Sequence, residues 1–491
     1  MNISTGVEKI KKRKRLFSFF LVAMVTIYLL LGFLPNMHLF SSIGTSGDSS
    51  ARDQTIKNVY ALMTSSRDKL LNRDYQGALD DINKAIALSE DDIAELYLLR
   101  GNIHASINRY DSAIQDYTRA LSLDPTLTEI YEIRGHLYYE KKDYENALKD
   151  YDKVLQHNPN NSEVLLARVN IYLSQESYNY ALNDIKTLLE HEPENGSFYA
   201  LLGDVHSALG NYDEAIDSYN SALNYLSNED DKEKIYLALG NCSFNLEQYE
   251  SAVEHYSKYL ETANTNEKAD MGEIYFHRGI SHIQLAKYEE AVNDLSSAIE
   301  LGYQPELSAF QRGLAYYMLE QYIEAISDLE IYVNAYPDNS DPWIYLALSY
   351  YNTEDYNKAI TYFEKCINAN LMPGESHYHL ATIYLNRKQY NKAITHYTAS
   401  ANLNYQTDYS IFNRGVAYLN LNKIEQAKND FQKVEKITAN PDLKKSAKDA
   451  VNKLSKINIQ ENVKTQENVK IQENVKQNIQ QNVQQQTTLQ Q

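Results

Sequence analysis

One alanine recurs along most of this chain at almost constant intervals. The steps between copies are 34 residues in seven cases and 35, 37 and 39 in the others, at Ala78, Ala113, Ala147, Ala181, Ala215, Ala252, Ala291, Ala325, Ala359, Ala393 and Ala427. A tyrosine lies three residues before each alanine except at Ile424, and a small residue such as Gly101 or Gly313 lies twelve before it in most copies. A fixed period of this length restricts the chain to an architecture of repeated units.

Each unit contains two apolar runs at helical spacing, separated by a short polar turn, as in residues 306–339. Two such helices cannot bury their apolar faces alone, so each hairpin must stack on the next. The small residue lets the helices approach, and an aromatic four residues after the alanine is expected to fill the space between them, at Tyr117, Tyr151, Tyr219, Tyr256, Phe363, Tyr397 and Phe431. We predict an all-α solenoid, a superhelix of about eleven helix-turn-helix units.

This order of residues resembles the tetratricopeptide repeat. The family order of small residue, Tyr, Ala, aromatic, Ala and Pro is followed by Gly101, His104, Ala113, Tyr117, Ala120 and Pro125, with His in the Tyr position. It returns as Gly135, Tyr138, Ala147, Tyr151, Val154 and Pro159. The resemblance covers residues 59–441 as eleven repeats. It implies that the first helix of each unit lines a concave face where extended or helical segments of other proteins bind.

Three positions on the first helices supply the candidate partner-binding residues. Acids lie six residues before the small position, at Glu95, Glu129, Glu163, Glu273, Asp341 and Glu375. Aromatics lie four beyond it, at Tyr139, Phe244, Tyr317 and Tyr351, and asparagines one beyond it, at Asn102, Asn170 and Asn241. Tyr and Asn suit peptide recognition through rigid area and hydrogen bonds. Simple solubility explains the acids equally well.

Some relatives in this family grip the C-terminal tails of chaperones with Asn and with cations on inner positions. Here Leu98, Glu132 and Leu166 stand where the cations are needed, so that activity is disfavoured.

Arginine precedes the small position in six copies, and an aspartate follows sixteen residues later in each. The pairs are Arg100 and Asp116, Arg134 and Asp150, Arg168 and Asp184, Arg278 and Asp294, Arg312 and Asp328, and Arg414 and Asp430. Copies with leucine before the small position lack the aspartate. We predict an ion pair that joins the two helices of a unit, and we favour a structural role over contact with a ligand.

The segments that flank the repeats have different characters. Residues 16–34 carry no charge and would span roughly 28 Å as a helix, enough to cross a bilayer. The basic residues 1–15 before them favour a cytoplasmic N-terminus with the repeats on the other side. A cleaved signal peptide, giving a secreted protein, is the alternative. We expect a linker at 35–58, a capping helix at 442–457 and a disordered Gln-rich tail at 458–491.

Several function classes are disfavoured. A net charge of −19 argues against nucleic-acid binding, and two cysteines are too few for a disulfide framework or a zinc site. No phosphate-binding loop or nucleophile elbow is present. We therefore expect no enzyme activity, no metal or cofactor, and no small-molecule substrate.

The function predicted from these features is a membrane-anchored scaffold or adaptor that binds proteins or peptides, with basic segments favoured. The alternative is a receptor or co-chaperone-like subunit for protein translocation or envelope assembly. A subunit whose activity resides in a partner is a further possibility.

Overall fold

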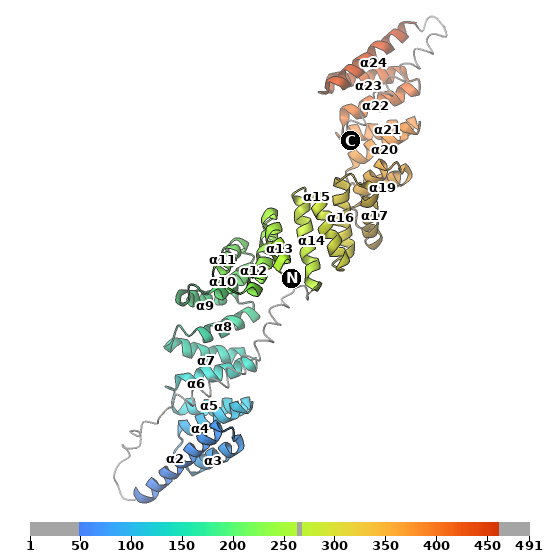
Figure 1. Cartoon of the computed structure of the whole chain (residues 1–491). Coiled ribbons are helices and arrows are strands. Elements are labelled where there is room, and N and C mark those ends of the chain that lie inside the picture. The colour runs from blue at the N-terminus through green and yellow to red at the C-terminus, as the bar shows by residue number, and fades with distance from the viewer. Residues whose placement is uncertain (1–48, 263–267, 461–491) are drawn as a thin grey trace. The chain divides into compact units, whose positions relative to one another are not determined.

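The computed structural model describes residues 49–262 and 268–460, and within these ranges it contains twenty-three helices and no strand (Figure 1). The predicted all-α fold is confirmed. Helices α2 to α23 form eleven antiparallel hairpins, and α24 follows the last of them. In each hairpin the even-numbered helix comes first in the chain. These are called the first helices, and their odd-numbered partners are called the second helices.

The chain divides into two compact units. The first ends at Asn228 and contains five hairpins. Its helices are α2 (Ser49–Leu71), α3 (Tyr75–Leu88), α4 (Ala94–Ser106), α5 (Tyr110–Leu123), α6 (Thr128–Glu140), α7 (Tyr144–His157), α8 (Ser162–Ser174), α9 (Tyr178–His191), α10 (Gly196–Ala208) and α11 (Tyr212–Tyr225).

The second unit begins at Glu229 and contains six hairpins and α24. Its helices are α12 (Glu229–Asn245), α13 (Tyr249–Thr262), α14 (Lys268–Gln284), α15 (Tyr288–Glu300), α16 (Pro305–Met318), α17 (Tyr322–Ala335), α18 (Trp343–Asn352), α19 (Tyr356–Asn368), α20 (Pro373–Asn386), α21 (Tyr390–Asn402), α22 (Thr407–Asn420), α23 (Ile424–Ile437) and α24 (Pro441–Gln460).

Several predicted segments lie outside the described residues: the basic segment 1–15, the membrane helix 16–34, and the tail from residue 461 on. The start predicted for the disordered tail, residue 458, is wrong, because residues 458–460 still belong to α24. The linker predicted at 35–58 is wrong at its end, because residues 49–58 already belong to α2. No Gly or Pro interrupts the sequence from Ser49 to Leu71, so this helix continues ahead of the first repeat. In the part of the chain that the structure describes, no helix combines the length and apolar character needed to cross a membrane.

The interior of each hairpin depends on the small residue of the first helix. A Cβ atom added at Gly101 would lie 2.7 Å from the ring of Tyr117, and one added at Gly240 would lie 2.6 Å from the ring of Tyr256. The repeated alanine of the second helix is fully buried in all eleven hairpins. The tyrosine three residues before it begins the second helix, with Ile424 in that place in α23. The small residues therefore set the distance between the helices.

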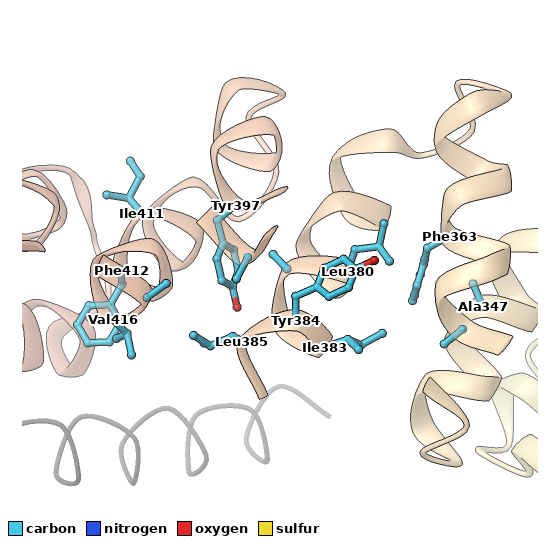
Figure 2. Packing of buried hydrophobic residues seen from close by; sticks show 14 of the residues in the cluster. Ala347, Phe363, Leu380, Ile383, Tyr384, Leu385, Tyr397, Ile411, Phe412 and Val416 are labelled. Carbon is cyan, nitrogen blue, oxygen red and sulfur yellow. The ribbon is translucent and has the colours of Figure 1, made fainter. Parts of the chain in front are cut away.

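Successive hairpins share their apolar faces. In the second unit one buried cluster extends from Phe310 in α16 to Leu454 in α24. Figure 2 shows this continuity, with Phe363 of α19, Tyr384 of α20 and Phe412 of α22 following one another along the stack. Helix α24 buries Leu443, Ala447, Ala450 and Leu454 in the same cluster. It thereby covers the apolar face of the last hairpin, as the terminal unit of a repeat array must.

Enlarging the repeated alanine tests this packing. Ala113→Leu should destabilise the α4–α5 hairpin by about 1–3 kcal/mol, because the site has no room for three further carbon atoms. Gln115→Leu, at an exposed position of the same helix, is the matched control and should change stability by less than about 0.5 kcal/mol. Amide hydrogen exchange in α4 and α5 measures both. Equal protection in the two variants would contradict the proposed constraint.

Candidate partner-binding surface

All six Arg–Asp pairs found in the sequence form ion pairs in the structure. In each, Nε and Nη2 of the arginine donate to the two carboxylate oxygens of the aspartate, at 2.6 to 2.9 Å. The aspartates are buried, with 4% to 6% of their surface exposed. This two-bond geometry is the strong form of a guanidinium–carboxylate contact. It joins the first and second helices of one hairpin.

The same arginines also reach the preceding hairpin, which the sequence analysis missed. Nη1 donates to an oxygen on the preceding second helix, at 2.7 to 3.1 Å, in Asn83, Thr118, Asp152, Ser257, Ser296 and Thr398. Each arginine thus holds three helices together. The available signal was a polar residue sixteen positions before the arginine in four copies, seventeen before Arg100, and twenty-one before Arg278, where an insertion intervenes.

Hairpins without the arginine use other contacts. In the α2–α3 hairpin Asp81 accepts hydrogen bonds from Ser65 and Lys69, so a lysine on the next turn of α2 supplies the missing cation. In the α20–α21 hairpin His377 and His396 face each other, with 2.9 Å between their Nδ1 atoms. Tyr362 of α19 stacks on Tyr350 of α18. Contacts without an ion pair therefore join the helices of these last two hairpins.

We call each Arg–Asp ion pair, with its contact to the preceding hairpin, an arginine staple. A double-mutant cycle tests whether the two side chains of one staple stabilise each other. Arg312→Leu should cost about 3–5 kcal/mol, because it leaves the buried Asp328 carboxylate without its cation. Arg312→Leu combined with Asp328→Ser copies the Leu202 and Ser218 pair of another repeat and should cost less than the sum of the single changes. Hydrogen exchange in α16 and α17 gives the energies. Additive costs would show that the two side chains do not stabilise each other.

Two of the three candidate asparagines belong to the hairpin interior. The Tyr117 hydroxyl donates to Oδ1 of Asn102 at 2.7 Å, and the Tyr256 hydroxyl donates to Oδ1 of Asn241 at 2.9 Å. Asn102 is only 3% exposed. A buried phenol needs a hydrogen-bond partner, and the Oδ1 atoms of these asparagines supply it. That the same asparagines contact a partner stays a prediction. Asn170 differs, since Ile185 occupies the tyrosine position opposite it and has no hydroxyl.

The four candidate aromatics are half-buried, and each packs on the residue that begins its own second helix. Ring centroids are 5.9 to 6.1 Å apart in the pairs Tyr139 and Tyr144, Phe244 and Tyr249, Tyr317 and Tyr322, and Tyr351 and Tyr356. Three of them also touch the next hairpin, through His277, Tyr345 and His379. These rings therefore stabilise the stack, and only their outer edges remain for a partner.

The candidate acids are the most accessible of the predicted residues. Glu95, Glu129, Glu273 and Asp341 are exposed, while Glu163 and Glu375 are half-buried. Glu375 accepts a hydrogen bond from the Tyr405 hydroxyl at 3.0 Å. Glu95, Glu129, Glu163 and Glu375 lie in the first turn of a first helix, where the positive end of the helix dipole favours them.

Glu132, which is not one of the candidate partner-binding residues, lies beside Glu163 in the first unit. Burial, and secondly the charge of Glu163, raise the pKa of Glu132. Burial also raises the pKa of Glu163. Asn161 donates to Glu132 at 3.0 Å, and Nε2 of His136 lies 3.7 Å from Glu163. Among the described residues, neither carboxylate forms an ion pair with a lysine or arginine.

Eight of the eleven first helices lack a lysine and lack an unpaired arginine, whereas α2, α12 and α14 contain lysine. In α4, α6, α8 and α10 of the first unit, and in α16, α18, α20 and α22 of the second, lysine is absent and each arginine is paired with a buried aspartate. The surface formed by these helices is therefore acidic in both units. We call it the first-helix surface.

Both cysteines and several histidines pack inside the hairpins. Cys242 and Cys366 are buried, and burial raises the pKa of the Cys366 thiol to about 11. His379 stacks on Phe363 at 5.4 Å, and burial lowers its pKa to about 4. Burial lowers the pKa of His396 to about 4 as well. Within the described ranges, no group of three or more His, Cys, Asp or Glu side chains could hold a metal ion.

These histidines predict how the second unit responds to acid. Between pH 6.5 and 4, His379 and His396 are protonated in the unfolded chain but remain neutral in the folded protein. The free energy of unfolding therefore falls as the pH decreases, by at most about 1.4 kcal/mol per pH unit for each histidine. His379→Phe keeps a ring against Phe363 and should weaken this dependence. The exposed His157→Phe is the control and should preserve it. Hydrogen exchange in α20 between pH 7 and 4 is the measurement.

Models of the tetratricopeptide repeat match residues 94–127, 129–161, 166–231, 233–266, 272–301 and 409–441. A further model, described as anaphase-promoting complex, cyclosome, subunit 3, matches residues 318–400. The matched spans follow the hairpins along both units. The chain is a tetratricopeptide repeat protein.

Solved structures similar to this tetratricopeptide repeat protein were also found. One is a tetratricopeptide repeat protein from Parabacteroides merdae ATCC 43184, with 23% identity, a TM-score of 0.34, and coverage of 53% of this chain and 99% of that one. Another is YrrB, described as having an unusual peptide-binding site, with 22% identity, a TM-score of 0.33, and coverage of 38% and 92%. The P58(IPK) repeat domain has 16% identity, a TM-score of 0.26, and coverage of 76% and 99%. The comparison with curated proteins gave no match.

Proposed function

We propose that this tetratricopeptide repeat protein is a membrane-anchored scaffold that holds basic polypeptides along its first-helix surface. One observation carries the proposal. The first helices present carboxylates such as Glu95 and Glu129 to solvent, and the half-buried Glu163 lies on the same surface, whereas their arginines are neutralised inside the hairpins. A surface of one charge sign attracts partners of the other sign and accelerates their association.

The cluster of Glu129, Glu132 and Glu163 supports the same proposal. Burial raises the pKa of two of these carboxyl groups, Glu132 and Glu163, so the charged form of each carries a cost in the free protein. A lysine or arginine of a partner would offset that cost. Sites that lower stability in the free protein often serve binding.

The anchor in this proposal rests on the sequence. The uncharged residues 16–34 would cross the bilayer, and the basic residues before them would keep the N-terminus in the cytoplasm. The repeats would then work on the non-cytoplasmic side. Binding is the whole mechanism, with no chemical step on this chain.

Neutralising carboxylates tests the binding surface. The probe is a fluorescent nonapeptide of alternating Gly and Arg, and the protein is the full-length chain in neutral detergent micelles. Replacing Glu95, Glu129 and Glu163 by Gln together should weaken peptide binding by about tenfold at low salt, since each exposed pair contributes under about 1 kcal/mol. The difference should shrink as salt rises.

The matched control removes three exposed acids of second helices in the same unit, through Glu190→Gln, Asp213→Asn and Glu214→Gln. It changes the net charge equally and should leave affinity within about twofold. If the control weakens binding as much as the first-helix variant, attraction depends on total charge and the surface has no specific role.

Protease accessibility tests the topology. A C-terminal tag on the full chain should be digested in intact protoplasts, because the repeats are expected outside the cytoplasmic membrane. A cytoplasmic protein serves as the lysis control. A tag that resists protease until the membrane is dissolved would place the repeats in the cytoplasm, and a tag released into the medium would indicate signal-peptide cleavage.

A further inference from the structure

In the second unit, two hydrogen bonds close the interface between neighbouring hairpins, which we call the seam. Each bond joins an acid to a hydroxyl residue thirty positions later in the chain. Tyr405 donates to Glu375 at 3.0 Å, and Thr438 donates to Asp408 at 2.6 Å. In each pair the acid lies at the start of a first helix and its partner lies just before the next one. Glu273 and Tyr303 have the same spacing, and burial followed by the Glu273 charge raises the pKa of Tyr303.

The corresponding residues of the α16–α17 hairpin are Glu306 and Tyr336, and there the seam is open. Both line a cavity of about 360 Å³, together with Gln304, Leu307 and Tyr332. Tyr336 packs on Tyr332, with 4.9 Å between ring centroids, and is 48% exposed. The acid at this position accepts a hydrogen bond from a hydroxyl in the two closed seams. The Glu306 carboxylate lines the cavity instead.

The connection after α17 explains why this seam stays open. Four residues link α15 to α16, α19 to α20, and α21 to α22, whereas seven residues, 336–342, link α17 to α18. Pro337 and Pro342 lie in that connection, and α18 is the shortest of the described helices. Tyr332 is itself held by a stack on Phe310 at 4.7 Å and by a hydrogen bond from Asn339 at 3.1 Å. The wall of the cavity is thus fixed by its neighbours.

The lining has the chemistry of a site for a cation on an alkyl stem. Glu306 supplies a carboxylate, Gln304 an amide, and Leu307, Tyr332 and Tyr336 supply apolar walls. Aromatic faces beside a carboxylate favour ammonium and guanidinium groups, while the apolar walls suit the methylene groups behind them. The volume lies at the lower end of the range for ligand-binding pockets.

We propose that this cavity binds one ammonium or guanidinium group, as carried by a lysine or arginine side chain of the partner. The inference rests on the proposed function for the nature of the partner, but it concerns a site that the candidate residues do not include. The cavity would fix the position of one basic residue, whereas the exposed acids attract basic segments without regard to register. A free amine shares this chemistry and is the other source of the group.

The test measures binding of the Gly–Arg nonapeptide to the full-length chain in neutral micelles, at a salt concentration near 150 mM. Glu306→Gln should weaken binding about fivefold, and Tyr336→Ala should weaken it about threefold, since a partly buried charge pair and an aromatic wall each contribute around 1 kcal/mol. Glu324→Gln removes an exposed acid from the same hairpin and is the matched control. It should leave affinity unchanged.

The outcomes separate this inference from the proposed function. Weaker peptide binding in Glu306→Gln and Tyr336→Ala, with unchanged binding in Glu324→Gln, supports the cavity site. Unchanged affinity in both cavity variants overturns it, while loss in the Glu95, Glu129 and Glu163 variant would still support the scaffold. Equal loss in Glu306→Gln and Glu324→Gln also overturns it, because net charge alone would then explain binding.

Competition with arginine methyl ester identifies the source of the cation. Displacement of the peptide by millimolar ester, lost in Glu306→Gln, supports a site that recognises the cationic group itself. If the ester does not displace the peptide, but Glu306→Gln still weakens peptide binding, the cavity binds the cation of a polypeptide side chain. Displacement that persists equally in Glu306→Gln places the ester elsewhere and contradicts the inference.

Discussion

The close approach of two helices at one small residue is the constraint on which the other features depend. Gly101 faces Tyr117, and the same contact recurs between Gly415 and Phe431. With the helices this close, the aromatic ring reaches across and is buried completely. A phenol buried there needs a hydrogen-bond partner, which the residue after the small position supplies in five hairpins, at Asn102, His136, Asp204, Asn241 and Thr382. The many tyrosines of the chain follow partly from this arrangement.

The arginine staples add coupling between hairpins. Each joins an aspartate of its own hairpin to a polar oxygen of the hairpin before it, so it contributes both to the stability of a repeat and to the interface with its neighbour. In repeat proteins these two terms together determine how cooperatively the array unfolds. The staple is absent from α2, α10, α12, α18 and α20, so these first helices do not contribute this coupling.

The repeat architecture could be predicted from the sequence because its period is uniform and its small and aromatic positions recur in register. The binding surface was harder to predict, since a position on a first helix does not reveal what the opposite helix requires. Asn102 and Asn170 occupy equivalent positions, yet only Asn102 faces a tyrosine hydroxyl. Comparing each residue with the one fifteen positions later would have separated them. The cavity beside Glu306 depends on the length of a connection and on how Tyr336 packs, which periodicity does not describe.

The link between a buried tyrosine and its acceptor limits how such a chain can evolve. A hairpin carries both members of the pair, so duplication or deletion of a whole hairpin preserves them. Exchange of a single helix would place Tyr117 against Val416, or Phe431 against Asn102. A buried polar group would then have no hydrogen-bond partner. The arginine adds a weaker condition on the preceding copy. Recombination in this chain should therefore conserve intact hairpins, together with the neighbour whose oxygen the next arginine needs.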